Sequence, residues 1–247
     1  MSTDVQVERN DRLRAVPLLV TILLALVIIF GSPLLTKYTS SLLHLGLTKD
    51  RLLPYLYVHH AWMLILALGA IAVVKRFVPA DYGLHLPRGK SYVGYALFWG
   101  VLLGAGTLAI GVWHGKPDMG YPLTPANISG WLFFEGVYVG PTEEIPFRAL
   151  LVSYLAATMP GRIVRVVWVR MNLAGVICAL IFALAHLRSF FTGSPLLALE
   201  QVSFALLLGL IYAWLLERSH SVLAPAIAHN AVDFTLTAWQ QAWAVFG

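Results

Sequence analysis

The chain has 247 residues, of which 59% are hydrophobic and only 12% are charged, and its formal net charge is +5. Soluble domains are typically about 45–50% apolar and about 25% charged, so this composition excludes an ordinary soluble protein and indicates an integral membrane protein. The basic residues are spread over short polar segments, which favours a role in membrane orientation over nucleic-acid binding. A single cysteine, Cys178, excludes an intramolecular disulfide and a cysteine-based zinc site.

The N-terminal segment predicts a retained membrane helix. Residues 1–14 form a polar tail, and an apolar run begins at Ala15. No small-x-small cleavage pattern follows before Pro33, and the apolar stretch continues through Leu35. A cleaved signal peptide would need such a pattern, so we expect a first membrane span near residues 15–35.

The later apolar runs predict a polytopic helical protein, because a helix needs about 20 apolar residues to cross a bilayer. The run 131–158 is interrupted at Gly140-Pro141, and Thr142 is a suitable N-cap for a helix that begins at Glu143. We therefore expect seven or eight transmembrane helices that enclose an intramembrane cavity. The predicted fold class is all-α, with residues 1–247 as a single domain. The runs lie near 15–35, 53–74, 91–113, 131–158, 166–187, 195–216 and 221–245.

The distribution of basic residues predicts the orientation of the chain. Lys and Arg collect in the cytoplasmic segments of membrane proteins. Lys and Arg residues are more frequent before the first apolar run and after the second run than after the third. The segment between the first and second runs also carries three of them, so the asymmetry is small. We expect a cytoplasmic N-terminus and leave the side of the C-terminus open. The residues are Arg9, Arg12, Arg14, Lys75, Arg76, Arg88 and Lys90 on one side, against Lys37, Lys49, Arg51 and Lys116 on the other.

The stretch "GPTEEIPFRALL", residues 140–151, places charged side chains in an apolar region. Glu144 and Arg148 are four residues apart and can pair on one helix face, while Glu143 lies about 100° away around the helix. A structural Arg–Glu clamp between helices would explain Glu144 and Arg148 but would leave Glu143 without a purpose. We therefore expect Glu143 to point into a cavity and to be functional.

Two later runs carry further ionisable groups. His186 ends the run "VICALIFALAH", and His229 and Asp233 lie four residues apart in "AIAHNAVDF", on one helix face. Asn230 is about 100° off that face and is the weaker candidate. A lone histidine on an apolar helix is more often a hydrogen-bonded core residue than a catalytic one, but three helices that each carry such groups favour one shared polar pocket.

Taken in order, these motifs resemble those of the CPBP family, which includes the CAAX prenyl endopeptidases of the Rce type and bacterial proteins linked to bacteriocin processing or immunity. The family pattern is Glu-Glu-x-x-x-Arg, Phe-x-x-x-His and His-x-x-x-Asn/Asp on successive membrane helices. In this chain the motifs, within residues 130–236, read Glu143-Glu144-Ile-Pro-Phe-Arg148, Phe182-Ala-Leu-Ala-His186 and His229-Asn-Ala-Val-Asp233.

The resemblance implies an intramembrane peptidase, and the residues suit that chemistry. Glu143 is the favoured base, by a narrow margin over Glu144, and would deprotonate a water molecule together with His186. The best-placed donor to the resulting oxyanion is His229. Because the motifs contain no nucleophilic serine or cysteine, the sequence argues against a covalent mechanism. Supporting roles fall to Arg148, which would fix Glu144, and to Phe182 and Asn230.

Asp233 stands where the family commonly has asparagine. An asparagine can donate a hydrogen bond to a developing oxyanion, whereas an ionised aspartate cannot. If Asp233 acts, it must orient His229, be protonated or bind a cation. The oxyanion role implied by the family is therefore open at this position.

The expected cofactor is none, and the alternative is zinc bound by Glu143, His186 and His229 in a metallopeptidase. The chain has no His-Glu-x-x-His motif. The expected partners are a lipid bilayer and a peptide or protein substrate, for which the resemblance suggests prenylated CAAX tails; no nucleic acid is expected. Two other classes stay open: a proton-coupled transporter, because Gly140-Pro141 resembles the break in a discontinuous transport helix, and a non-catalytic membrane scaffold.

Overall fold

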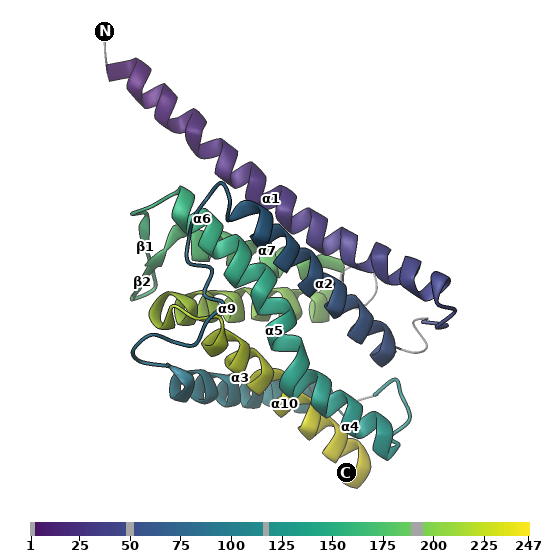
Figure 1. Ribbon diagram of the computed structural model, residues 1–247. Coiled ribbons are helices and arrows are strands. Elements are labelled where there is room, and N and C mark those ends of the chain that lie inside the picture. The colour runs from purple at the N-terminus through teal and green to yellow at the C-terminus, as the bar shows by residue number, and fades with distance from the viewer. Residues whose placement is uncertain (1–2, 48–51, 116–118, 189–194) are drawn as a thin grey trace.

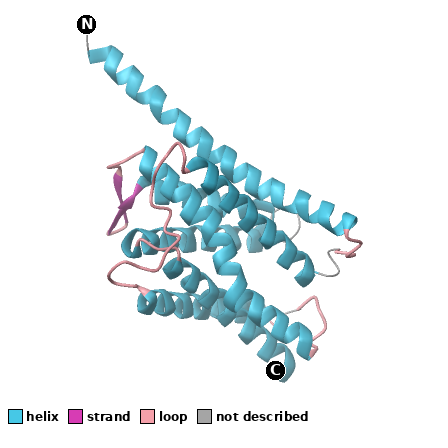
Figure 2. Cartoon of the chain, viewed as in Figure 1, coloured by secondary structure: helices cyan, strands magenta, loops and turns pink. Residues whose placement is uncertain are grey.

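The computed structural model describes residues 3–47, 52–115, 119–188 and 195–247, and these are mostly helical (Figures 1 and 2). The elements, in chain order, are α1 (Thr3–Leu42), α2 (Leu52–Val74), α3 (Val93–His114), α4 (Pro125–Phe133), η2 (Phe134–Tyr138), α5 (Val139–Glu144), η3 (Ile145–Val152), α6 (Ser153–Thr158), β1 (Ile163–Val166), β2 (Val169–Asn172), α7 (Leu173–Ala185), η4 (His186–Arg188), α9 (Pro195–Ser219) and α10 (Leu223–Phe246).

Residues 125–158 form one continuous helical run, from α4 to α6, through the middle of the molecule (Figure 1). The predicted N-cap at Thr142, with a new helix from Glu143, is therefore wrong, and the run is one helical piece rather than two. The Thr142 hydroxyl donates back to the carbonyl oxygens of Tyr138 and Val139, both at 2.9 Å, as a residue inside a helix does. Pro141 and Pro146 remove two backbone N–H donors, and the helix adapts by widening into the π-helical turns η2 and η3 without breaking.

The last helix, α10, is positioned by close packing on α3. A side chain at Gly100 would place its Cβ 2.5 Å from the Ala231 Cβ and 2.8 Å from the Ala228 carbonyl oxygen. One turn later, a Cβ atom at Gly104 would lie 2.8 Å from the Thr235 Cβ. This glycine pair, four residues apart, lets the two helix backbones approach as small residues do in membrane helix pairs. The opposite face of α10, about 150° away, carries His229 and Asp233.

Helices α7 and α9 also meet through small residues. The Cβ position of Gly209 in α9 lies 3.0 Å from Ala179 in α7, and that of Gly175 in α7 lies 3.0 Å from Ala213 in α9. Close contact of this kind brings the end of α7, with Phe182 and His186, next to α9 and the central helical run. Cys178 is buried in the same region, as expected for a small core residue.

The structure is mostly helical, in line with the all-α prediction, and adds two short strands. Antiparallel strands β1 and β2 pair with Ile163 opposite Asn172 and Arg165 opposite Arg170. The predicted span 166–187 is therefore wrong in its first part, because α7 begins only at Leu173. The physical reason is the sequence "IVRVVWVRMN", which is rich in β-branched residues and carries an arginine in each strand, a composition that fits a hairpin better than a membrane helix.

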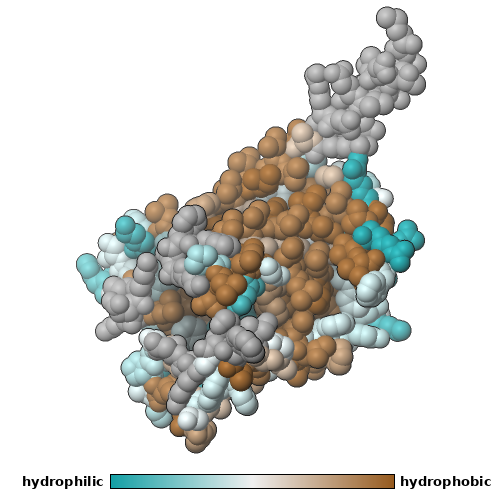
Figure 3. Space-filling view, turned by 180° about the vertical axis from the view of Figure 1, so that it is seen from behind, coloured by the Kyte–Doolittle hydropathy of each residue, from teal (hydrophilic) through white to brown (hydrophobic). Residues whose placement is uncertain are grey.

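Within the described residues, three helices are long and apolar enough to cross a membrane: Ala15–Leu42, Leu52–Val74 and Pro195–Ser219. Shorter apolar helices cover Val93–Ala109 and Leu173–Ala185. Figure 3 shows a broad apolar surface on the helical body, as expected for a protein surrounded by lipid. The backbone of α1 already begins at Thr3, so the helix includes most of the predicted polar tail.

Candidate active site

The centre of the site is a buried ion pair on the central helical run. The Arg148 Nε atom lies 3.1 Å from Glu144 Oε2, and the two side chains are 1% and 0% exposed. The predicted i,i+4 pairing is thus confirmed. An arginine and a glutamate can be held away from water only when each neutralises the other, so this pair fixes the arrangement of α5 and η3.

Aromatic rings enclose the Arg148 guanidinium. Its Cζ atom lies 4.4 Å from the centre of the Phe182 ring, from α7, and 5.1 Å from that of Tyr212, from α9. Phe147 packs edge-on against Phe182 with ring centroids 5.0 Å apart. The electron-rich faces of such rings stabilise a desolvated cation. The predicted supporting residue Phe182 therefore lies directly against Arg148.

His229 connects α10 to this pair. Its Nδ1 atom lies 2.7 Å from Glu144 Oε1, and its Nε2 atom lies 3.1 Å from Asp233 Oδ2. The Tyr212 ring stacks on the imidazole at 5.1 Å between centroids. With a carboxylate at each nitrogen and a ring on one face, the orientation of His229 is fixed. Asp233 is thus in a position to orient His229, one of the three roles open to it.

Glu143 lies beside this network and is less enclosed. Its side chain is 18% exposed, and its two carboxylate oxygens face different histidines: Oε1 is 3.8 Å from His60 Nε2 and Oε2 is 3.9 Å from His229 Nε2. Both distances are too long for direct hydrogen bonds. They are short enough for one oxygen atom of a water or substrate to contact Glu143 and either imidazole at the same time.

His60, from α2, is a site residue that the sequence analysis did not select. Its ring is buried, and its Nδ1 atom lies 3.0 Å from the Thr142 hydroxyl. The only signal in the sequence is an ionisable residue near the start of an apolar run, and His59 beside it carries the same signal. Nothing in the spacing indicates which of the two faces Glu143.

His186 ends α7 and begins η4. Its Nδ1 atom lies 2.9 Å from the Phe182 carbonyl oxygen, and its ring packs edge-on against Phe182 at 5.0 Å between centroids. Because a carbonyl only accepts, Nδ1 carries the proton, and in the neutral ring Nε2 is the nitrogen that can take up another. The ring lies close enough to Glu143 to act on its carboxylate electrostatically.

Asn230 holds the backbone rather than the site itself. The Gly140 N–H donates to Asn230 Oδ1 at 2.7 Å, and Asn230 Nδ2 donates to the Val137 carbonyl oxygen at 3.3 Å. A Cβ atom at Gly140 would lie 2.4 Å from the Ala226 carbonyl oxygen. The contact therefore joins the widened turn η2 to α10 and needs glycine at position 140.

Glu135, in η2, is a further carboxylate near the site. It acts electrostatically on Asp233, His229 and Glu143, which places it on the same side of the central run. It is not among the site residues predicted from the sequence. With Glu135, the site combines four carboxyl groups with the imidazoles of His60, His186 and His229 and with Arg148, so it is rich in acidic side chains.

The zinc alternative involves Glu143, His186 and His229. In this structure His229 Nδ1 lies 2.7 Å from Glu144 Oε1 and Nε2 lies 3.1 Å from Asp233 Oδ2, so each ring nitrogen has a carboxylate neighbour. Within the part of the chain that the structure describes, no group of three or more His, Cys, Asp or Glu side chains has a geometry that could hold a metal ion.

Comparison with known families gives one match. Residues 125–235 match the model of the family described as type II CAAX prenyl endopeptidase Rce1-like. The matched segment runs from the start of α4 into α10 and includes Glu143, Glu144, Arg148, His186, His229 and Asp233. Helix α2, with His60, lies outside it. No curated protein and no solved structure gives a significant match to the chain.

The burial of Glu144 predicts a difference in stability between the two adjacent glutamates. Glu144→Gln should lower the free energy of unfolding by about 3–5 kcal/mol, because it leaves Arg148 buried without its counter-ion. Glu143→Gln should lower it by less than about 1 kcal/mol. Unfolding of the purified protein in mild detergent, by titration with a denaturing detergent, measures both values. Equal losses in the two variants would contradict the assignment of Glu144 as the structural partner.

Proposed function

We propose that the chain is an intramembrane endopeptidase in which Glu143 activates a water molecule, because residues 125–235 match the model of the Rce1-like family of type II CAAX prenyl endopeptidases. This match implies a peptidase that acts on a peptide or protein. The observation that carries the proposal is the position of Glu143, which faces two imidazoles while its neighbour Glu144 pairs with Arg148 and His229.

The first step is attack by water on the scissile carbonyl carbon. Glu143 accepts a proton from the water, with His186 assisting as the second acid/base group, and the oxygen forms a bond to the carbon while the carbonyl electrons move to its oxygen. The proton then passes to the leaving amine as the C–N bond breaks. Glu144 and Arg148 keep Glu143 in place. No covalent enzyme intermediate is needed.

The proposed donor to the oxyanion is His229 at Nε2. The same atom lies 3.1 Å from Asp233, so an ionised Asp233 would compete with the oxyanion and repel it. The donor role therefore requires that Asp233 carries a proton or turns aside when substrate binds. A protonated Asp233 could itself donate to the oxyanion, as the asparagine common in the family does.

The proposed substrate is a C-terminal, prenylated or lipid-proximal peptide segment, as the family description suggests. The proposed chemistry needs no metal, and the engagement of both His229 nitrogens supports this.

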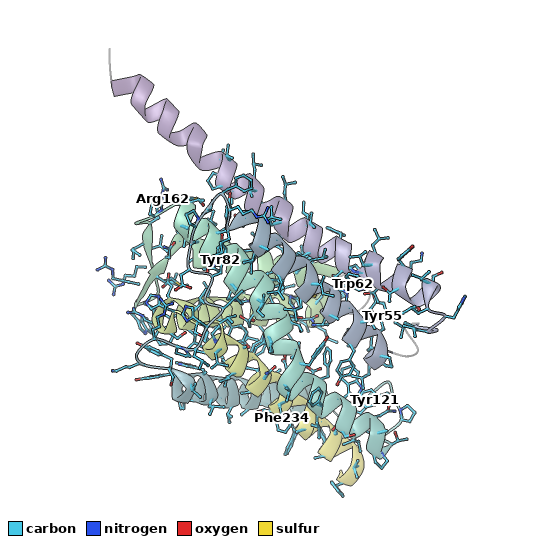
Figure 4. The ribbon with its side chains drawn as sticks, in the orientation of Figure 1. Tyr55, Trp62, Tyr82, Tyr121, Arg162 and Phe234 are labelled. Atoms are coloured by element: carbon cyan, nitrogen blue, oxygen red, sulfur yellow. The ribbon has the colours of Figure 1, made fainter. Side chains whose placement is uncertain are left out.

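We also propose seven membrane crossings, by α1, α2, α3, the central run 125–158, α7, α9 and α10, with the N-terminus in the cytoplasm. In support, the loop 75–92 and the hairpin lie at the same end of the molecule as the N-terminus (Figure 1). Figure 4 shows Arg162 and Tyr82 at this end, whereas Tyr55 and Tyr121 lie toward the other end. The loop is tied to the turn between α9 and α10 by a hydrogen bond from the Val222 N–H to the Gly83 carbonyl oxygen at 3.0 Å. Cytoplasmic ends of membrane proteins are rich in basic residues, and this one carries Lys75, Arg76, Arg88, Lys90, Arg162, Arg165 and Arg170.

Substitution of the two acid/base groups should abolish cleavage without loss of folded protein. Glu143→Gln and His186→Ala should each lower kcat by about 10²–10⁴-fold. The assay is cleavage of a fluorogenic farnesylated CAAX peptide by protein in detergent or liposomes, with folded yield measured by size-exclusion chromatography. Full activity in either variant would remove that residue from the mechanism. A transporter would be favoured by two results together. Wild-type protein would yield no cleaved product, and liposomes with Glu143→Gln would still show flux of ions or solutes.

Metal removal should leave the reaction unchanged. Treatment with EDTA or 1,10-phenanthroline followed by desalting should not change the cleavage rate, because the proposed base and donors are side chains of the protein. The same assay measures this. A loss of activity that zinc reverses would overturn the metal-free mechanism.

A further inference from the structure

A histidine outside the matched family segment contacts the proposed catalytic turn at two points. His60 lies in α2, which packs against α5 and η3. Its Nδ1 atom is 3.0 Å from the hydroxyl of Thr142, and its Nε2 atom is 3.8 Å from Oε1 of the next residue, Glu143. One imidazole thus holds the backbone turn and faces the reactive carboxylate.

The hydrogen bonds around Thr142 determine which nitrogen of His60 carries the proton. The Thr142 hydroxyl has a single hydrogen, which it directs to the Tyr138 and Val139 carbonyl oxygens. Thr142 Oγ can therefore only accept from His60, so Nδ1 is the donor. In the neutral ring this leaves the lone pair on Nε2, the nitrogen that faces Glu143.

Packing keeps the ring in this orientation. His60 is 5% exposed, and the edge-to-face contact with Phe134 has ring centroids 5.0 Å apart. The His59 ring also packs edge-to-face against His60, with centroids 5.4 Å apart. A buried imidazole held by two rings and one hydrogen bond has no freedom to turn Nε2 away from Glu143.

We propose that His60 is a further site residue for the peptidase reaction, which accepts a hydrogen bond at Nε2 from the water that Glu143 deprotonates. One hydrogen of that water goes to Glu143, the other points at His60, and a lone pair of the oxygen is thereby directed at the scissile carbonyl carbon. The proton balance of the reaction is unchanged, because His60 keeps its Nδ1 proton and gains none. The inference rests on the proposed function.

Two substitutions separate this role from a structural one. In His60→Asn the side-chain amide can still donate to Thr142, as Nδ1 does, but nothing remains at the position of Nε2. In His60→Gln the longer amide carbonyl can reach the position of Nε2 and accept from the water, but the bond to Thr142 is lost. A purely structural His60 would thus be replaced better by asparagine, and a water-positioning His60 better by glutamine.

The test is cleavage of the farnesylated fluorogenic CAAX peptide by full-length variants with equal chromatographic profiles. We expect His60→Asn to lower kcat by about 10²-fold with KM within about threefold of wild type, because the water is misplaced while the substrate still binds. We expect kcat of His60→Gln to be at least about tenfold higher than kcat of His60→Asn. Wild-type kcat in His60→Asn, or higher activity in His60→Asn than in His60→Gln, would overturn the inference. If wild type cleaves the peptide and Glu143→Gln does not, a contrary result for the His60 variants overturns only this inference, and the proposed function stands. If wild type itself does not cleave the peptide, the inference and the proposed function are both wrong.

A second, independent observation concerns the hairpin β1–β2. Its tip exposes two large apolar side chains, Val167 at 67% and Trp168 at 81%. Val167 has a φ of 56°, a conformation that β-branched residues rarely adopt. The turn is held in part by a hydrogen bond from Arg165 Nε to the Val167 carbonyl oxygen at 3.2 Å. The hairpin therefore keeps a strained turn that presents an aromatic ring outward.

The charges on the hairpin indicate what the tip meets. Arg165 and Arg170 lie directly opposite each other across the two strands, and both are exposed. Like charges at opposite cross-strand positions repel unless an anion lies between them. The neighbouring loop shows the same combination, with Phe77 at 79% exposure next to Lys75 and Arg76.

We infer that the hairpin binds the anionic headgroups of the adjoining membrane leaflet, with Trp168 in the interfacial layer and the Arg165–Arg170 pair on lipid phosphates. Tryptophan is enriched at this depth of a bilayer, and basic side chains at the surface are attracted to anionic lipids. A planar leaflet next to the ends of the helices meets both requirements together, since it offers an apolar layer directly beneath a layer of phosphates.

The test uses Trp168→Cys in a Cys178→Ala background, labelled at residue 168 with an environment-sensitive fluorophore and placed in nanodiscs of neutral or of neutral plus anionic phospholipid. We expect a blue shift of emission in the anionic discs, and we expect Arg165→Gln with Arg170→Gln to remove it. An emission spectrum that does not depend on lipid charge, or a shift that persists in the double glutamine variant, would overturn the inference. Solvent-like emission that changes only when inorganic phosphate is added would overturn it as well.

Discussion

Desolvation of Arg148 is the constraint on which the site depends. A guanidinium that is only 1% exposed needs its counter-ion and its aromatic neighbours, and these come from different parts of the chain. Glu144 lies on the same helical run, Phe182 comes from α7, Tyr212 from α9, and the imidazole that shares Glu144 comes from α10. Four helices thus converge on one buried charge. Displacement of any of them would leave that charge with too few partners, so the requirement to pair Arg148 also determines where the remaining polar groups lie.

Full engagement of Glu144 gives the adjacent carboxylate a different environment. Glu144 Oε1 and Oε2 are directed to His229 and Arg148, whereas the Glu143 oxygens lie nearly 4 Å from the nearest imidazoles. The two glutamates are adjacent in sequence and therefore point about 100° apart around the helix. Glu144 points at the buried ion pair, and Glu143 points at the partly exposed side that faces His60 and His229. The separation follows from helix geometry, and it accounts for both halves of the Glu-Glu motif without assigning them the same task.

The parts of this site that could be predicted from sequence are those within one helix. The Glu144–Arg148 and His229–Asp233 pairs follow from four-residue spacing, and both are present. His60 could not be found in this way, because its relation to Glu143 depends on how α2 packs against α5, which no spacing records. The Gly140-Pro141 dipeptide predicts an interruption of the run 131–158, but spacing alone cannot decide between two helices and one distorted helix, because widened turns can absorb a lost N–H group. The hairpin was not predicted, because residues 166–172 are apolar enough to be read as the start of the membrane helix that follows them.

Exposure changes across the site in a direction that suits hydrolysis within a membrane. Glu144 and Arg148 are sealed, while Glu143 is 18% and Asp233 is 26% exposed on their side chains. Electrostatic interactions are strongest where water is excluded, so the sealed pair can hold the neighbouring groups with little reorganisation. Hydrolysis also consumes water, which must reach the base from the open side. A site with one side closed to water and one side open to it allows strong electrostatic interactions and also lets water reach the base. The Gly140 N–H bond to Asn230 Oδ1 helps to maintain this arrangement, because it holds the central helical run against α10. The acidic motif lies in α5, which follows the widened turn η2 directly, so the contact with α10 also holds the segment in which Glu144 faces the ion pair and Glu143 faces the accessible side.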